Sequence, residues 1–134
     1  MAVEKMSPEE YARIKSAVAV ELTRHIGPAH GIGMGELSFA ATGKPWRNRI
    51  NDTRVLRKIV TELRKEGAAI CSDVANGYYL AQTAEDLAAH CARLRKSALK
   101  KLALEARFRR IALPDLVGQI ALDLGKEEAC GQEA

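Results

Sequence analysis

The sequence has few aromatic residues, few cysteines and no long apolar run. Aromatic side chains make up only 4% of the chain, so a core built from it must be aliphatic. Its three cysteines, Cys71, Cys91 and Cys130, lie far apart and form no Cys-x-x-Cys pair, which argues against a disulfide framework and a zinc site. No apolar stretch approaches the roughly 18 residues that span a bilayer, and the N-terminus lacks a signal-peptide pattern. We therefore expect a cytoplasmic protein with reduced thiols and no membrane segment.

Motifs for catalysis and cofactor binding are also missing. His25, His30 and His90 stand in no Ser-His-Asp or Cys-His spacing. The glycine-rich stretch HGIGMGEL (residues 30–37) has neither the Gly-Lys-Ser/Thr ending nor the preceding strand of a phosphate loop. We predict that the protein is not an enzyme and needs no cofactor, metal ion or small-molecule ligand.

What the chain does have is positive charge in two blocks. The net charge is only +4, but residues 41–65 hold eight basic and two acidic residues, and residues 93–110 hold eight and one. Residues 66–92, between the blocks, hold no Lys or Arg. Concentrated basic blocks indicate an anionic partner, with double-stranded DNA the first candidate. The alternative is that both blocks are solvated helix faces.

Local patterns predict two helices before the first basic block. Ser7, Pro8 and Glu10 are typical of a helix start, and Gly27-Pro28 ends that helix. A turn or very short strand is expected in the glycine-rich stretch, followed by a short helix at 34–41. We expect Trp46, the only tryptophan, to anchor the connector that follows.

A basic helix and a β-hairpin come next. Asn51 or Asp52 is expected to cap a helix that runs to Glu66. Asn76-Gly77 is typical of the tight turn of a hairpin between strands at 68–72 and 77–81. Alternation then places Tyr78 and Leu80 on the core side and Tyr79 on the other.

A long helix is predicted from a capping box at Thr83 to about Arg110, and Pro114 interrupts the pattern. Its apolar stripe either folds back on the domain or pairs with the same helix of a second chain, as a homodimer through residues 83–110. A last short helix at 116–124 and a tail without structure at 125–134 complete the chain. The stripe consists of Leu87, Cys91, Leu94, Ala98 and Leu102.

The basic helix carries aliphatic residues on one arc and cations on the opposite arc. A helix of this kind can be held by its apolar side while its cations enter the DNA major groove. The basic connector before it is well placed to contact phosphates. The predicted DNA-binding residues are Lys44, Arg47, Arg49, Asn51, Arg54, Arg57, Lys58, Thr61 and Lys65.

The run TRVLRKIVTELRKEGAAICSDVANGYYLA resembles the winged helix-turn-helix of the biotin-repressor N-terminal type, and is similar to small winged-helix proteins of phages and prophages. The resemblance covers roughly residues 17–110. It implies a DNA-binding fold but no biotin chemistry. One departure is that the wing has no Lys or Arg and carries Asp73. The matching positions are Arg54, Leu63, Arg64, Gly67, Ile70, Ser72, Gly77, Tyr78 and Leu80.

The expected fold is mainly α with a small β-hairpin (α+β): a winged helix-turn-helix domain at 8–82, followed by a long C-terminal helix in an extension at 83–124. The expected function is DNA binding, as a phage, prophage or bacterial transcriptional regulator or DNA-transaction factor. The alternative is a protein-interaction adaptor in which the winged helix is a scaffold and the long basic helix docks an acidic partner.

Overall fold

The computed structural model describes the backbone of residues 6–46 and 49–132, and the side chains of 6–46 and 51–126. The fold is mainly helical with one two-stranded antiparallel hairpin, as predicted. None of the helices in the described part is long and apolar enough to cross a membrane. The elements in order are α1 (Pro8–Leu22), the 3-10 turn η1 (Pro28–His30), α2 (Met34–Thr42), α3 (Arg49–Lys65), β1 (Ile70–Asp73), β2 (Gly77–Leu80), α4 (Ala84–Arg109) and α5 (Leu113–Gln132).

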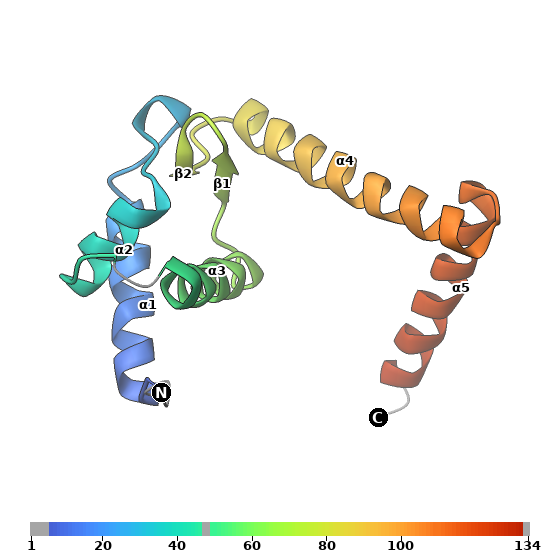
Figure 1. The fold of residues 1–134 in the computed structure, drawn as a ribbon, viewed down its shortest axis with the longest axis horizontal. Helices are drawn as coiled ribbons and strands as arrows, with labels where there is room; N and C mark the ends of the chain where they lie inside the picture. Colours follow the sequence, from blue (N-terminus) through green and yellow to red (C-terminus); the bar gives the residue numbers. More distant parts are fainter. Residues whose placement is uncertain (1–5, 47–48, 133–134) are drawn as a thin grey trace. The chain divides into compact units, whose positions relative to one another are not determined.

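The chain divides into two compact units, Met1–His90 and Cys91–Ala134. The first unit holds α1 to β2 and the beginning of α4, so it extends beyond the boundary expected at residue 82. In this unit α1, α2 and α3 pack together, with the hairpin beside them (Figure 1).

The core of the first unit is aliphatic, as the scarcity of aromatic residues requires. Spacings of three and four residues bring apolar side chains to the inner side of α1 and α3, and α2 adds the fully buried Leu37. The start of α1 agrees with the prediction, because the Glu10 amide donates to the Ser7 hydroxyl at 3.2 Å. The central residues are Ile14, Val18, Leu22, Ile32, Leu37, Leu56, Ile59, Val60, Leu63 and Ile70.

The glycine-rich stretch supplies a very short strand for the hairpin. Ile32 and Tyr78 exchange two backbone hydrogen bonds of 2.8 Å, so β2 lies between β1 and the Ile32 segment. Gly77 has φ of 77°, and a Cβ there would lie 2.4 Å from the Ile32 carbonyl oxygen. A glycine is required at position 77 both for the turn and for this close approach.

The hairpin has the predicted orientation, but its second face is covered as well. Tyr78 and Leu80 pack against the core, as expected. Tyr79, expected to point away, is only 2% exposed. The start of α4 covers this second face: the Ser72 amide donates to His90 Nδ1 at 3.3 Å, and Cys71 Sγ lies 3.9 Å from the Asp86 carbonyl oxygen.

Of three helix boundaries predicted from the sequence, one is confirmed and two are wrong. The capping box at the start of α4 is confirmed, because the Asp86 amide donates to Thr83 Oγ1 and the Thr83 amide to the Asp86 carboxylate, each at 3.1 Å. The predicted start of α3 is wrong, since the helix begins at Arg49 and not after a cap at Asn51 or Asp52. Helix α5 runs to Gln132, past the end expected at residue 124 and into the segment expected to be without structure.

Candidate nucleic-acid interface

The solvent side of α3 presents cations that lie opposite the core. At about 100° per residue, the buried positions of α3 and its basic positions fall on opposite arcs. Five residues on the arc opposite the core, four cations and one threonine, are exposed, as the sequence pattern predicts. We call this surface the α3 outer face; it consists of Arg54, Arg57, Lys58, Thr61 and Lys65.

The positive charge of the α3 outer face is not neutralised locally. In the described part of the chain, Arg54, Arg57 and Lys65 form no ion pair with a carboxylate. A solvent-exposed guanidinium or ammonium group in this position can exchange its water for a phosphate oxygen or a base edge. These three side chains are therefore anion-binding candidates that lie together on one helix face.

Lys58 lies at the edge of the face and contacts α1. Its Nζ lies 5.0 Å from the centre of the Tyr11 ring, a cation–π distance. Lys58 therefore helps to hold α3 against α1, and its replacement would change packing as well as charge.

Two acidic residues near the C-terminal end of α3 lie beside α1, where Lys15 balances part of their charge. Lys15 Nζ pairs with Glu62 at 3.4 Å and also with Glu66. The nearby Tyr11 hydroxyl and the Lys15 ammonium lower the pKa of Glu62, and burial together with the Glu62 carboxylate raises the pKa of Tyr11 to about 12. Because these acids are paired with α1, they offset the α3 outer face less than the sequence total suggests.

Arg64 belongs to the scaffold. Its Nε donates to the Ile70 carbonyl oxygen at 2.9 Å, and its terminal nitrogen donates to Ser72 Oγ at 3.3 Å. The guanidinium thus ties the end of α3 to β1. Its neighbour Lys65 is exposed, so two adjacent cations have different surroundings.

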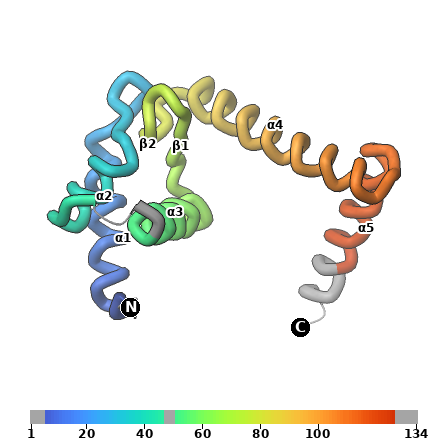
Figure 2. The backbone as a smooth tube through the Cα atoms, in the orientation of Figure 1, coloured from blue at the N-terminus to red at the C-terminus, as the bar shows by residue number. Residues whose placement is uncertain are grey.

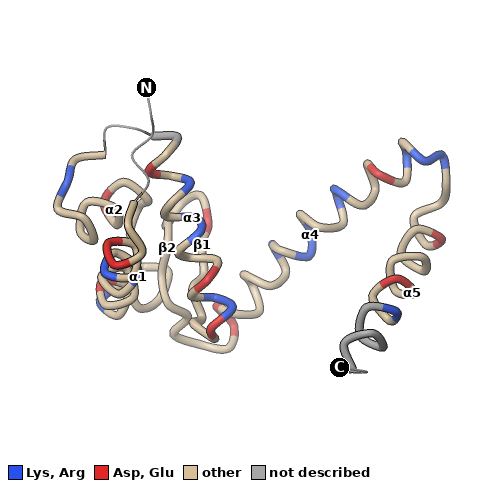
Figure 3. The backbone as a smooth tube through the Cα atoms, turned by 90° about the horizontal axis from the view of Figure 1, so that it is seen from below, with Lys and Arg blue, Asp and Glu red and all other residues tan. Residues whose placement is uncertain are grey.

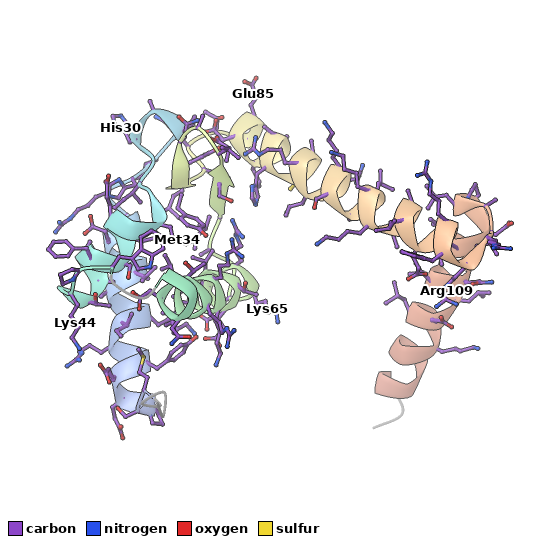
Figure 4. The ribbon with its side chains drawn as sticks, viewed as in Figure 1. His30, Met34, Lys44, Lys65, Glu85 and Arg109 are labelled. Atoms are coloured by element: carbon purple, nitrogen blue, oxygen red, sulfur yellow. The ribbon has the colours of Figure 1, made fainter. Side chains whose placement is uncertain are left out.

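Of the remaining predicted contact residues, the structure describes the side chains of Lys44 and Asn51. Lys44 is exposed on the connector beside α2, away from Lys65 at the end of α3 (Figure 4). Asn51 is half-buried within α3. Arg49 begins α3, but its side chain lies outside the described residues, as does all of Arg47.

Lys44 borders a cleft of about 770 Å³ between α1, α2, the connector and the start of α3. The cleft carries charges of both signs, from Glu10, Arg13 and Asp52 as well as Lys44. Such a mixture gives no simple preference for an anion. Within the described residues, no group of three His, Cys, Asp or Glu side chains could hold a metal ion.

Trp46 anchors the connector to α2. A Cβ on Gly35 would lie 2.3 Å from the Trp46 ring, so the indole rests directly on the helix backbone at a position where only glycine leaves room. The sequence signal that could have located this contact was the glycine inside a predicted helix. The connector therefore has a fixed attachment to the domain.

The hairpin tip offers no positive charge. The Asp73 carboxylate accepts bonds from the Asn76 amide at 2.6 Å and from the Asn76 side chain at 3.0 Å. Val74 between them is fully exposed. The Asn76 side chain is thus engaged within the turn.

Comparison with known proteins gives no match: no family model, curated protein or solved structure resembles this chain. The winged-helix resemblance of residues 17–110 stays a prediction. The geometry and charge of the α3 outer face are consequently the observations that bear on the function of the protein.

Proposed function

We propose that the protein binds double-stranded DNA with the α3 outer face, as a winged helix-turn-helix. One observation carries the proposal: Arg54, Arg57 and Lys65 have no carboxylate partner in the described structure, on a helix whose opposite side is held by a packed core. A rigid helix with unpaired cations fits the major groove, where arginine can bind guanine and lysine can bind phosphate.

The order of elements supports the same proposal. Helix α1, the short Ile32 segment, α2, α3 and the hairpin follow one another, with β2 paired on both sides. This succession is the one expected of a winged helix, with α3 as the recognition helix and the hairpin as the wing. The uncharged tip leaves the α3 outer face as the main contact, and a role in transcriptional control or another DNA transaction of a phage or bacterium would follow.

Fluorescence anisotropy with random duplex DNA over a salt series tests the proposal. If about six phosphates are contacted, log K falls with log salt at a slope near −5. The variant Arg54→Gln, Arg57→Gln and Lys65→Gln should bind at least about 100-fold more weakly, because each lost contact costs about 1–3 kcal/mol. Its salt slope should be shallower by about 3.

A matched control removes the same charge from α4. Lys96, Lys100 and Arg107 are exposed, and their replacement by Gln changes the net charge equally. This control should lose far less affinity. Equal losses in the two variants would mean that binding follows net charge alone, and the proposal would be wrong. Absence of binding at low salt would favour the alternative, an adaptor in which basic α4 docks an acidic protein.

A further inference from the structure

Both helices of the second unit, Cys91–Ala134, have an apolar stripe that the structure leaves largely open. On α4 the stripe continues through Leu94, Ala98 and Leu102, and Leu94 is 54% exposed. On α5 it includes Ile120 and Leu124, the latter 55% exposed. Aligned apolar side chains in contact with water mark an interaction surface.

The two helices have opposite charge. From Cys91 to Arg109, α4 holds seven basic residues and one acidic residue, whereas α5 holds one basic and four acidic residues. Figure 3 shows the basic positions along α4 and the acidic positions of α5. A basic amphipathic helix and an acidic one are complementary in the same way as the charged positions that set pairing in coiled coils.

The helices have matching lengths but do not cover each other. Helix α4 from Cys91 to Arg109 and the whole of α5 are each about five turns long. They diverge from the short turn that joins them (Figure 2), the corner in which Arg110 has φ of 54°. Among the described residues of this unit, only Ala106 and Leu116, on either side of that corner, are buried. Each stripe therefore lacks a partner over most of its length.

We propose that a second copy of this chain fills both stripes, with α4 of one chain packed along α5 of the other and the reverse. Such an exchange forms a closed two-fold interface, in which every basic helix meets an acidic one. A separate acidic partner for α4 would leave the α5 stripe exposed, whereas a second copy covers both at once. This proposal does not depend on DNA binding.

Sedimentation velocity of the full chain over a concentration series, without DNA, tests the proposal. We expect a reversible monomer–dimer equilibrium that weakens as salt is added, because charge complementarity contributes to it. Leu124→Lys places a cation against the basic helix of the partner, and Leu94→Glu places an anion against the acidic one. Each variant should raise the dimer dissociation constant at least about tenfold.

The matched control is Leu122→Lys. Leu122 is on the same helix and is 69% exposed, but it lies about 160° around the axis from Leu124. This variant should dimerise within about threefold of the parent. Circular dichroism checks that all variants keep their helix content.

Two results would overturn the proposal. The first is a monomer at every concentration; if Leu94→Glu also lowers the melting temperature of that monomer, the two stripes belong to each other within one chain. The second is equal weakening by Leu124→Lys and Leu122→Lys. The DNA assay is separate, so failure of either proposal leaves the other testable.

Discussion

Helix α3 and the part of α4 that follows His90 are both basic and both have an apolar side, but their surroundings differ. On α3 the apolar side is buried by α1, α2 and the hairpin, and Ile59 is 0% exposed. On α4 the apolar side is open, with Leu94 more than half exposed. The same kind of amphipathic sequence thus yields a fixed helix in one unit and an unpartnered one in the other.

The difference shows what burial of the apolar side does for the charged side. A helix held by a core presents its cations in fixed positions, which recognition of a regular duplex requires. A helix with an open apolar side gains most free energy by covering that side. This contrast is the reason that we propose DNA binding for the α3 outer face and self-association for the second unit. Four predictions test the contrast between the two helices.

The largest expected effect is on the core behind α3. Replacing Ile59 by Ala should lower the free energy of unfolding of the first unit by about 3 kcal/mol, because a fully buried side chain leaves a cavity. Urea unfolding followed by fluorescence of Trp46 measures it. Leu104→Ala on α4, where the side chain is 54% exposed, should stay within about 0.5 kcal/mol of the parent. Similar losses in both would contradict the comparison.

The next effect separates two adjacent cations at the end of α3. Arg64→Ala should destabilise the first unit by about 2 kcal/mol, since the charged bonds to Ile70 and Ser72 are lost. Lys65→Ala should leave stability within about 0.5 kcal/mol of the parent and weaken DNA binding. Urea unfolding measures the stability of both variants, and fluorescence anisotropy measures their DNA binding. If Lys65→Ala destabilises the protein, Lys65 has a structural role and does not belong to the DNA-binding part of the α3 outer face.

A glycine at the corner of the second unit should have a smaller and stabilising effect. Arg110 has φ of 54°, and the Ile111 amide donates to the Ala106 carbonyl oxygen at 3.0 Å, as in a Schellman motif. Arg110→Gly should relieve this backbone strain and stabilise the helix end by up to about 1 kcal/mol. Arg109→Gly, at the last residue of α4, should have the opposite effect, because it adds backbone freedom and removes the ion pair with Glu105. Thermal melting by circular dichroism compares the two.

The last effect is the pH dependence of the contact between α1 and α3. The pKa of Glu62 is lowered in the fold, so its contribution is complete above its unfolded pKa of about 4.3 and is lost as pH falls through the lower folded pKa. The pKa of Lys15 is raised, so its contribution disappears only at strongly alkaline pH. Glu62→Gln should flatten the acid limb of urea midpoints measured from pH 3 to pH 7. Glu36→Gln, at an exposed position on α2, should leave that limb unchanged.

Most elements of the fold could be predicted from local patterns. The Ser7 cap, the Asn76-Gly77 turn and the capping box at Thr83 each depend on residues within one turn of one another, and the structure has all three. The start of α3 was misplaced because Asn51 and Asp52 are good cap residues that lie inside the helix. The capping preference of these two residues therefore does not decide where α3 begins.

The candidate site was only partly predictable. The helical period of residues 51–66 located the α3 outer face, because burial of one arc exposes the opposite arc. The period could not reveal that Arg64 reaches β1 or that Lys58 lies on the Tyr11 ring. Burial of Tyr79 was missed for the same reason, since it depends on the beginning of α4 covering the second face of the hairpin.

The sequence by itself determined where helices and turns form and which arc of α3 is basic, because caps, glycines and apolar spacing act over a few residues. Only the tertiary structure decided which cations stay available to a partner. Arg64 and Lys58 make contacts with segments distant in sequence, whereas Arg54, Arg57 and Lys65 form no ion pair with a carboxylate in the described structure. Such long-range pairings depend on how the elements pack together, and no local pattern encodes them.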